Sequence, residues 1–112
     1  MSSNKAVPRA LEHVSSDRAF YFYADIGKPL GVIASSLKEF GAVLKTVEHP
    51  SLDFHLKRGD FEKWVTMLGD GELVKSLARL REGSMGGEKL RTELVRVVQT
   101  RVRQLQRPSS KK

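Results

Sequence analysis

The 112-residue chain contains no cysteine, and asparagine and glutamine are scarce. Without cysteine, disulfides, thiolate catalysis and cysteine-bound zinc or iron–sulfur centres are excluded. Asn4 is the only asparagine, and the glutamines are Gln99, Gln104 and Gln106. A low content of asparagine and glutamine together with a high content of Lys, Arg and Glu is typical of proteins from thermophiles. Chance in a short chain is the alternative explanation.

Long apolar stretches are missing as well. No segment approaches the run of about 20 apolar residues that crosses a membrane as a helix, and residues 1–16 lack the apolar core of a signal peptide. We therefore expect a cytoplasmic protein without a membrane partner. At 112 residues the chain has room for one domain. We expect a flexible arm over 1–16, a single globular domain over 17–106 and a basic tail over 107–112.

Positive charge is the clearest compositional feature. The net charge is +7, and residues 88–112 hold eight basic and two acidic side chains, so this last quarter carries +6 of it. The remaining positive charge is only +1. The positive charge is therefore a local property of the last quarter of the chain and not a general one.

The order of the patterns predicts an α+β fold, with an N-terminal β-hairpin followed by four to five α-helices around one core. Residues 19–24 alternate as a strand, with Phe20 and Phe22 on one face and Tyr21 and Tyr23 on the other. A glycine- and proline-rich turn is expected over 25–31, before a second strand over 32–34. The two tyrosines are expected to pack against a helix, with stacking on bases as the alternative.

Capping residues and apolar spacing mark the helices. Ser36 and Glu39 form a capping box for a helix ending near Glu48, because Pro50 disfavours helical geometry at His49. Ser51, Asp60 and Asp70 are expected to cap the following three helices. A glycine-rich break over 83–87 precedes a last helix from about Glu88 to Gln106.

The last helix is predicted to be amphipathic, with a basic outer face. Projected at 100° per residue, its leucines and valines form a broad apolar face. The opposite face holds a basic stripe about 25 Å long, which is either a phosphate-binding surface or simply a solvated helix face. With the tail, the candidate nucleic-acid-binding residues are Lys89, Arg96, Arg103, Arg107, Lys111 and Lys112.

The segment from Phe54 to Trp64 reads F-H-x-x-R-G-D-F-x-x-W. In this motif, and in the aromatic strand over 19–23 and Ser-Leu-x-Glu-Phe over 36–40, the chain resembles a mainly archaeal family of small domains. The resemblance covers roughly residues 19–105. The family has no known activity, so the resemblance implies an archaeal-type intracellular setting and no mechanism.

His55, Arg58, Asp60 and Trp64 lie close together in this motif and have two interpretations. As a functional site, His55 and Asp60 would form an acid–base pair and Arg58 would bind an anion. As a structural cluster, Asp60 caps a helix, Arg58 pairs with a carboxylate, Trp64 fills the core and His55 hydrogen-bonds locally. We favour the structural interpretation, because capping and apolar spacing already explain these residue types.

Other candidate sites are weaker. His49, Asp53 and His55 are metal-capable, but Pro50 argues against one shared helical face, so we expect no metal site. Residues 83–89 resemble a phosphate loop without its G-K-[ST] ending, and Arg58-Gly59-Asp60 is a coincidental adhesion tripeptide. The sequence contains no nucleophile elbow and no cofactor fingerprint. We expect a protein that is not an enzyme and has no cofactor.

The leading hypothesis is a small basic protein that binds nucleic acid non-specifically through its last helix and tail. Clustered Lys and Arg side chains attract phosphates, and counterion release makes such binding salt-dependent. The alternative is a protein-interaction adaptor that docks on an acidic partner or self-associates.

Overall fold

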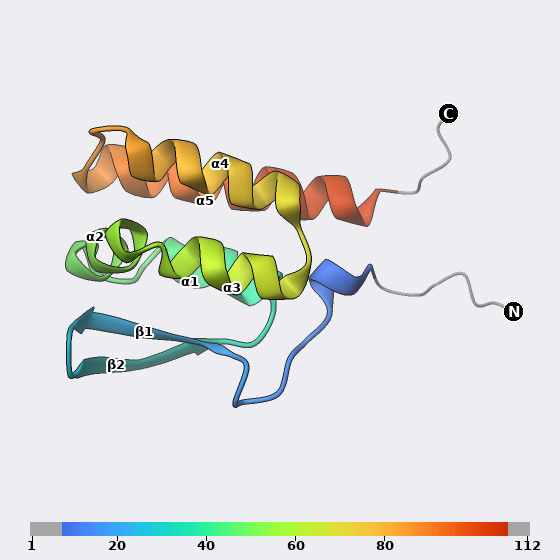
Figure 1. The fold of residues 1–112 in the computed structure, drawn as a ribbon, viewed down its shortest axis with the longest axis horizontal. Helices are drawn as coiled ribbons and strands as arrows, with labels where there is room; N and C mark the ends of the chain where they lie inside the picture. The colour runs from blue at the N-terminus through green and yellow to red at the C-terminus, as the bar shows by residue number, and fades with distance from the viewer. Residues whose placement is uncertain (1–7, 108–112) are drawn as a thin grey trace, which may run out of the picture.

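The computed structural model describes residues 8–107, and Figure 1 shows their elements in three layers. A β-hairpin forms one layer, three helices form the middle layer, and the last two helices lie on the other side of it. The predicted α+β fold is confirmed, with five α-helices after the hairpin. The elements are η2 (Arg9–Leu11), β1 (Phe20–Asp25), β2 (Lys28–Ala34), α1 (Leu37–Leu44), α2 (His49–Arg58), α3 (Asp60–Leu68), α4 (Gly71–Glu82) and α5 (Gly87–Gln106).

The hairpin turn is shorter than predicted. β1 and β2 pair antiparallel and are joined by Ile26 and Gly27 alone, with Gly27 at a φ of 72°. The expected turn over 25–31 is wrong, because β2 already begins at Lys28. Both strands of a two-stranded sheet are edges, so Pro29 is tolerated in β2. Phe22 pairs with Val32 but Tyr23 pairs with Pro29, so the ladder skips Leu30 and Gly31.

The phenylalanine face of the hairpin packs on the helices. Phe20 and Phe22 are buried and form an aromatic cluster with Phe40, Phe61 and Trp64. Tyr21, on the opposite face, is 46% exposed, and its hydroxyl donates to the backbone oxygen of Ser16. The expectation that the tyrosine face packs against a helix is therefore wrong for Tyr21. The helices cover one face of the sheet, and the more apolar face takes that place.

Two of the predicted caps are confirmed. Ser36 accepts a hydrogen bond from the backbone N–H of Glu39, and the Glu39 carboxylate accepts one from the N–H of Ser35. The side chain of Asp70 accepts from the N–H of Leu73 at 3.4 Å. The bonds to Ser36 and Asp70 satisfy N–H groups that the first turns of α1 and α4 would otherwise leave without partners, and the bond to Glu39 satisfies the N–H just before the N-cap of α1.

Around Pro50 the predicted boundaries are wrong. α1 ends at Leu44 rather than near Glu48, and α2 begins at His49, so Pro50 lies in its first turn. Proline is favoured there, because the first-turn N–H has no intrahelical acceptor to lose. Ser51 consequently lies inside α2, fully buried, and does not act as its cap.

The N-terminal segment contacts the domain from Pro8 onward. Ala10 is buried, Leu11 and Val14 pack against the core, and the N–H of Val14 donates to the oxygen of Ser35 at 2.8 Å. Residues Arg9–Leu11 form a single 3-10 turn. Residues 1–7 of the expected arm and 108–112 of the expected tail lie outside the described residues. Within 8–107, none of the helices has the length and apolar character needed to cross a bilayer.

Candidate functional site

α5 positions the predicted basic stripe. Its apolar residues Leu90, Leu94, Val98 and Val102 are buried, and the helix packs against α1 and α4. Burial of this face turns the opposite face to solvent. Lys89, Arg96, Arg103 and Arg107 are all exposed, as the periodicity predicts.

Three of the six described cations of α5 and its C-cap are paired with carboxylates. Arg91 lies 2.9 Å from Glu88, Arg96 lies 2.6 Å from Glu93, and Arg101 lies 2.8 Å from Asp70. Hydrogen bonding to Arg96 lowers the pKa of the Glu93 carboxyl, so that carboxyl stays ionised at neutral pH. The charge of Arg96, a member of the predicted stripe, is therefore locally balanced by Glu93.

The charges of three other cations, Lys89, Arg103 and Arg107, are not balanced by a neighbouring carboxylate in the described part of the chain. None of them forms an ion pair with another residue in the range 8–107. Arg103 makes one hydrogen bond, from Nη2 to the hydroxyl of Thr100 at 3.3 Å. Lys111 and Lys112, the other two predicted binding residues, lie outside the described part of the chain.

A groove between α1 and α5 adds a cation that the sequence analysis did not select. The groove has a volume of about 270 Å³, and its lining consists of Lys38, Gly41, Gln99, Val102, Arg103 and Gln106. Two cations and two amides face it, and no carboxylate does. The charged side chains of this lining are both cations, and the two amides can turn their NH₂ groups toward an anion.

Gly41 brings the two helices of this groove together. A Cβ atom at position 41 would lie 3.2 Å from Cγ1 of Val98, so the small residue permits close packing of α1 on α5. Lys38 and Lys45 lie one turn before and one turn after Gly41, on the same side of α1. The position of Lys38 one turn before a glycine could have indicated from the sequence that Lys38 lies beside a close helix contact. Only the packing shows that the helix in contact is α5.

The neighbouring groove between α4 and α5 is less suited to an anion. It measures about 400 Å³ and is lined by Arg79, Arg96 and Arg101, but also by Glu72. Arg96 and Arg101 are both held by carboxylates, as described above. The α1–α5 groove is therefore the better anion site.

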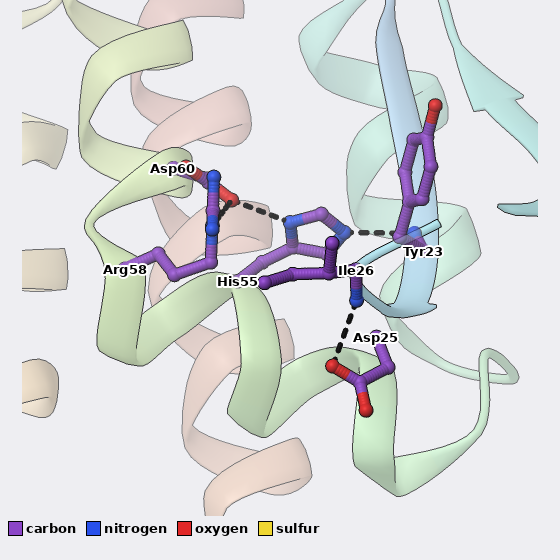
Figure 2. Close-up of polar contacts among 6 residues, drawn as sticks. All are labelled: Tyr23, Asp25, Ile26, His55, Arg58 and Asp60. Atoms are coloured by element: carbon purple, nitrogen blue, oxygen red, sulfur yellow. Dashed lines mark hydrogen bonds and ion pairs between the residues drawn. The ribbon is translucent and has the colours of Figure 1, made fainter. Parts of the chain in front are cut away.

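His55 makes two hydrogen bonds that fix its protonation state (Figure 2). Its Nδ1 lies 2.9 Å from Oδ2 of Asp60, and its Nε2 lies 2.8 Å from the backbone nitrogen of Tyr23. Because the N–H of Tyr23 can only donate, Nε2 must accept and the proton of the neutral ring is on Nδ1. Burial lowers the pKa of His55, against the opposing effect of Asp60. Both ring nitrogens are occupied, so His55 connects α2 to β1.

The other residues of this cluster are also held by contacts within the fold, but Asp60 does not act as the predicted helix cap. The N-cap of α3 is Gly59, with a φ of 76° and no side-chain cap. The Asp60 carboxylate instead accepts from His55 and from Nε of Arg58 at 3.0 Å. The predicted carboxylate partner of Arg58 is thus Asp60 itself. Trp64 is buried as predicted, and its Nε1 donates to the backbone oxygen of Arg18.

The metal-capable residues do not converge. His49 lies 2.8 Å from Glu88 on α5, whereas His55 bonds to Asp60. Within residues 8–107 there is no group of three or more acidic or histidine side chains arranged to hold a metal ion.

Comparison of the chain with protein-family models, with curated proteins and with solved structures found no match. The resemblance based on the Phe54–Trp64 motif stays a prediction. Function is therefore inferred from the geometry of residues 8–107.

Proposed function

We propose that this chain is a non-catalytic, cytoplasmic protein that binds nucleic acid without strong sequence selectivity, through phosphate contacts along α5 and the adjoining side of α1. The observation that carries this proposal is the α1–α5 groove, in which Lys38 and Arg103 face the same space and no carboxylate lines it.

The arrangement suits a phosphate backbone rather than base edges. Lys89, Arg103 and Arg107 follow one side of a single helix, where Lys and Arg attract phosphates irrespective of sequence. Gln99 and Gln106 beside them supply neutral donors for phosphate or sugar oxygens. Binding of this kind releases counterions and weakens as salt rises.

The test is a fluorescence anisotropy titration of labelled single-stranded RNA and of duplex DNA at several salt concentrations. We expect binding to both, with an affinity that falls steeply with salt. In the double variant Lys38→Glu/Arg103→Glu the affinity should fall at least about tenfold, and the slope of log K against log salt should decrease by about 2, since two phosphate contacts are lost.

A matched control separates the groove from overall charge. Lys57→Glu/Lys75→Glu changes the net charge by the same amount at exposed helical positions that do not line the groove. This control should bind nearly as the wild type does. Equal losses in the two double variants would show that total charge, not the α1–α5 groove, controls binding.

An acidic polypeptide distinguishes the adaptor alternative. Poly-glutamate presents negative charge without the phosphate spacing. If it bound as tightly as nucleic acid at equal salt, the proposal would be refuted in favour of an acidic protein partner.

A further inference from the structure

A second cavity lies between the hairpin and the corner formed by α2 and α3. It measures about 680 Å³, within the range of about 300–1,000 Å³ that is usual for small-molecule sites. It shares no residue with the α1–α5 groove. Five aromatic residues line it, from β1 on one side and the helices on the other: Phe20, Tyr21, Tyr23, Phe54 and Trp64.

One edge of β1 faces this cavity. β1 pairs with β2 through one edge only. The N–H of Tyr23 points away from β2, because it donates to His55. Successive residues of a strand direct their backbone groups to opposite sides, so the N–H and C=O of Tyr21 also point away from β2.

The open length of this edge is too short for a peptide strand. His55 already occupies the N–H of Tyr23, and Trp64 already occupies the backbone oxygen of Arg18. Within β1, this edge then offers the N–H and C=O of Tyr21 and the C=O of Tyr23, which is one donor and two acceptors. A peptide added to the sheet needs several consecutive free groups, whereas the edge of one heteroaromatic ring needs only a donor and an acceptor.

The charges around the cavity favour an anion. Arg18 and Lys63 are exposed and form no ion pair within residues 8–107. Two carboxylates also line the cavity: Asp60 is held by His55 and Arg58, and Asp17 accepts from the hydroxyl of Ser15 and keeps its negative charge. The three lining cations, Arg18, Arg58 and Lys63, outnumber them, so the lining has a net charge of +1. Arg58 lies 5.0 Å from the centre of the Phe54 ring, which keeps a cation beside an aromatic wall.

We propose that this cavity binds a small heteroaromatic anion of mononucleotide size. The ring lies among the aromatic walls and bonds to the edge of Tyr21, and the phosphate lies near Lys63 and Arg18. This site is separate from the nucleic-acid surface proposed above and does not depend on it.

The chain carries its own probe, because Trp64 is the only tryptophan and lines the cavity. Titration with AMP should change Trp64 fluorescence saturably, with a Kd on the order of 10⁻⁴ M. Adenosine, which lacks the phosphate, and ribose 5-phosphate, which lacks the ring, should each bind at least about tenfold more weakly. Amide chemical shifts should move at Tyr21 and Lys63.

Variants locate the site. Lys63→Glu should weaken AMP binding at least about tenfold, a loss typical of one charged contact. The control Lys75→Glu should leave AMP binding unchanged. Lys38→Glu/Arg103→Glu should also leave it unchanged, so failure of the nucleic-acid proposal and failure of this one are separate results. The proposal is overturned if AMP gives no saturable response up to about 10 mM, if ribose 5-phosphate binds as well as AMP, or if Lys63→Glu binds like the wild type.

Discussion

Replacing His55 with alanine removes the side chain that joins β1 to the α2–α3 corner. The residue is 4% exposed, and its ring makes hydrogen bonds on both nitrogens. The variant leaves the N–H of Tyr23 without its acceptor, which costs about 1–3 kcal/mol, and opens a void in the aromatic cluster. We expect a loss of about 2–4 kcal/mol in the free energy of unfolding, and a Tm lower by about 10–20 °C for a domain of this size.

The comparison variant is His55→Gln. Its amide oxygen can accept from the N–H of Tyr23, so about half of the stability lost in His55→Ala should return. Urea unfolding followed by Trp64 fluorescence measures both variants. Equal destabilisation by alanine and glutamine would show that packing, not the bond to Tyr23, is the contribution of His55.

The same bond predicts a pH dependence. Protonated His55 has no acceptor for Tyr23, and burial lowers its pKa in the folded state. Asp60 and Arg58 are the charged groups in contact or close by, and their effects oppose each other. Below about pH 6.5 the unfolded chain binds a proton at His55 before the folded chain does. His55 therefore lowers the free energy of unfolding as the pH falls from about 6.5 towards the folded pKa of this residue. Above about pH 6.5 it adds no pH dependence, because the ring is neutral in both the folded and the unfolded chain.

His13 and His49 lie beside Glu39 and Glu88, so their contributions must be subtracted. The difference between wild type and His55→Gln does so, because both chains keep those histidines. Wild-type stability should decline relative to the variant as the pH falls below about 6.5. A constant difference across this range would refute the neutral, accepting role of Nε2.

Three further predictions concern single contacts and are measured by urea or thermal unfolding. Asp70→Ala removes the cap of α4 and leaves Arg101 without its carboxylate partner, so it should cost about 2–4 kcal/mol of stability. Asp70→Asn should cost less, because the amide oxygen can still cap the helix. Equal costs would contradict the capping role. Gly69→Ala should cost about 1–2 kcal/mol, since its φ is 93° and a Cβ would lie 3.0 Å from Nη1 of Arg9. Gly71→Ala is the control, because it has open space around it and an ordinary φ. Trp64→Phe should cost about 1–2 kcal/mol through the lost bond to Arg18, and a neutral result would show that this bond contributes nothing.

Local signals in the sequence predicted most of the helices. The Ser36–Glu39 box, the Asp70 cap and the apolar spacing of α3 and α5 act within a few residues, so they can be read without the fold. The boundaries near Pro50 could not be settled this way. Proline is compatible with both the end of one helix and the first turn of the next.

By itself the sequence determined the order of strands and helices, the apolar faces and the excess of positive charge near the C-terminus. Alternation in β1 defined two faces, but only packing decided that the phenylalanines are covered and Tyr21 is not. The hydrogen bonds of His55 with Tyr23 and of Arg101 with Asp70 join residues more than 30 positions apart, and Lys38 and Arg103, which line one groove, are also distant in the sequence. Such contacts depend on how the elements dock on one another, and no local pattern along the chain encodes that docking.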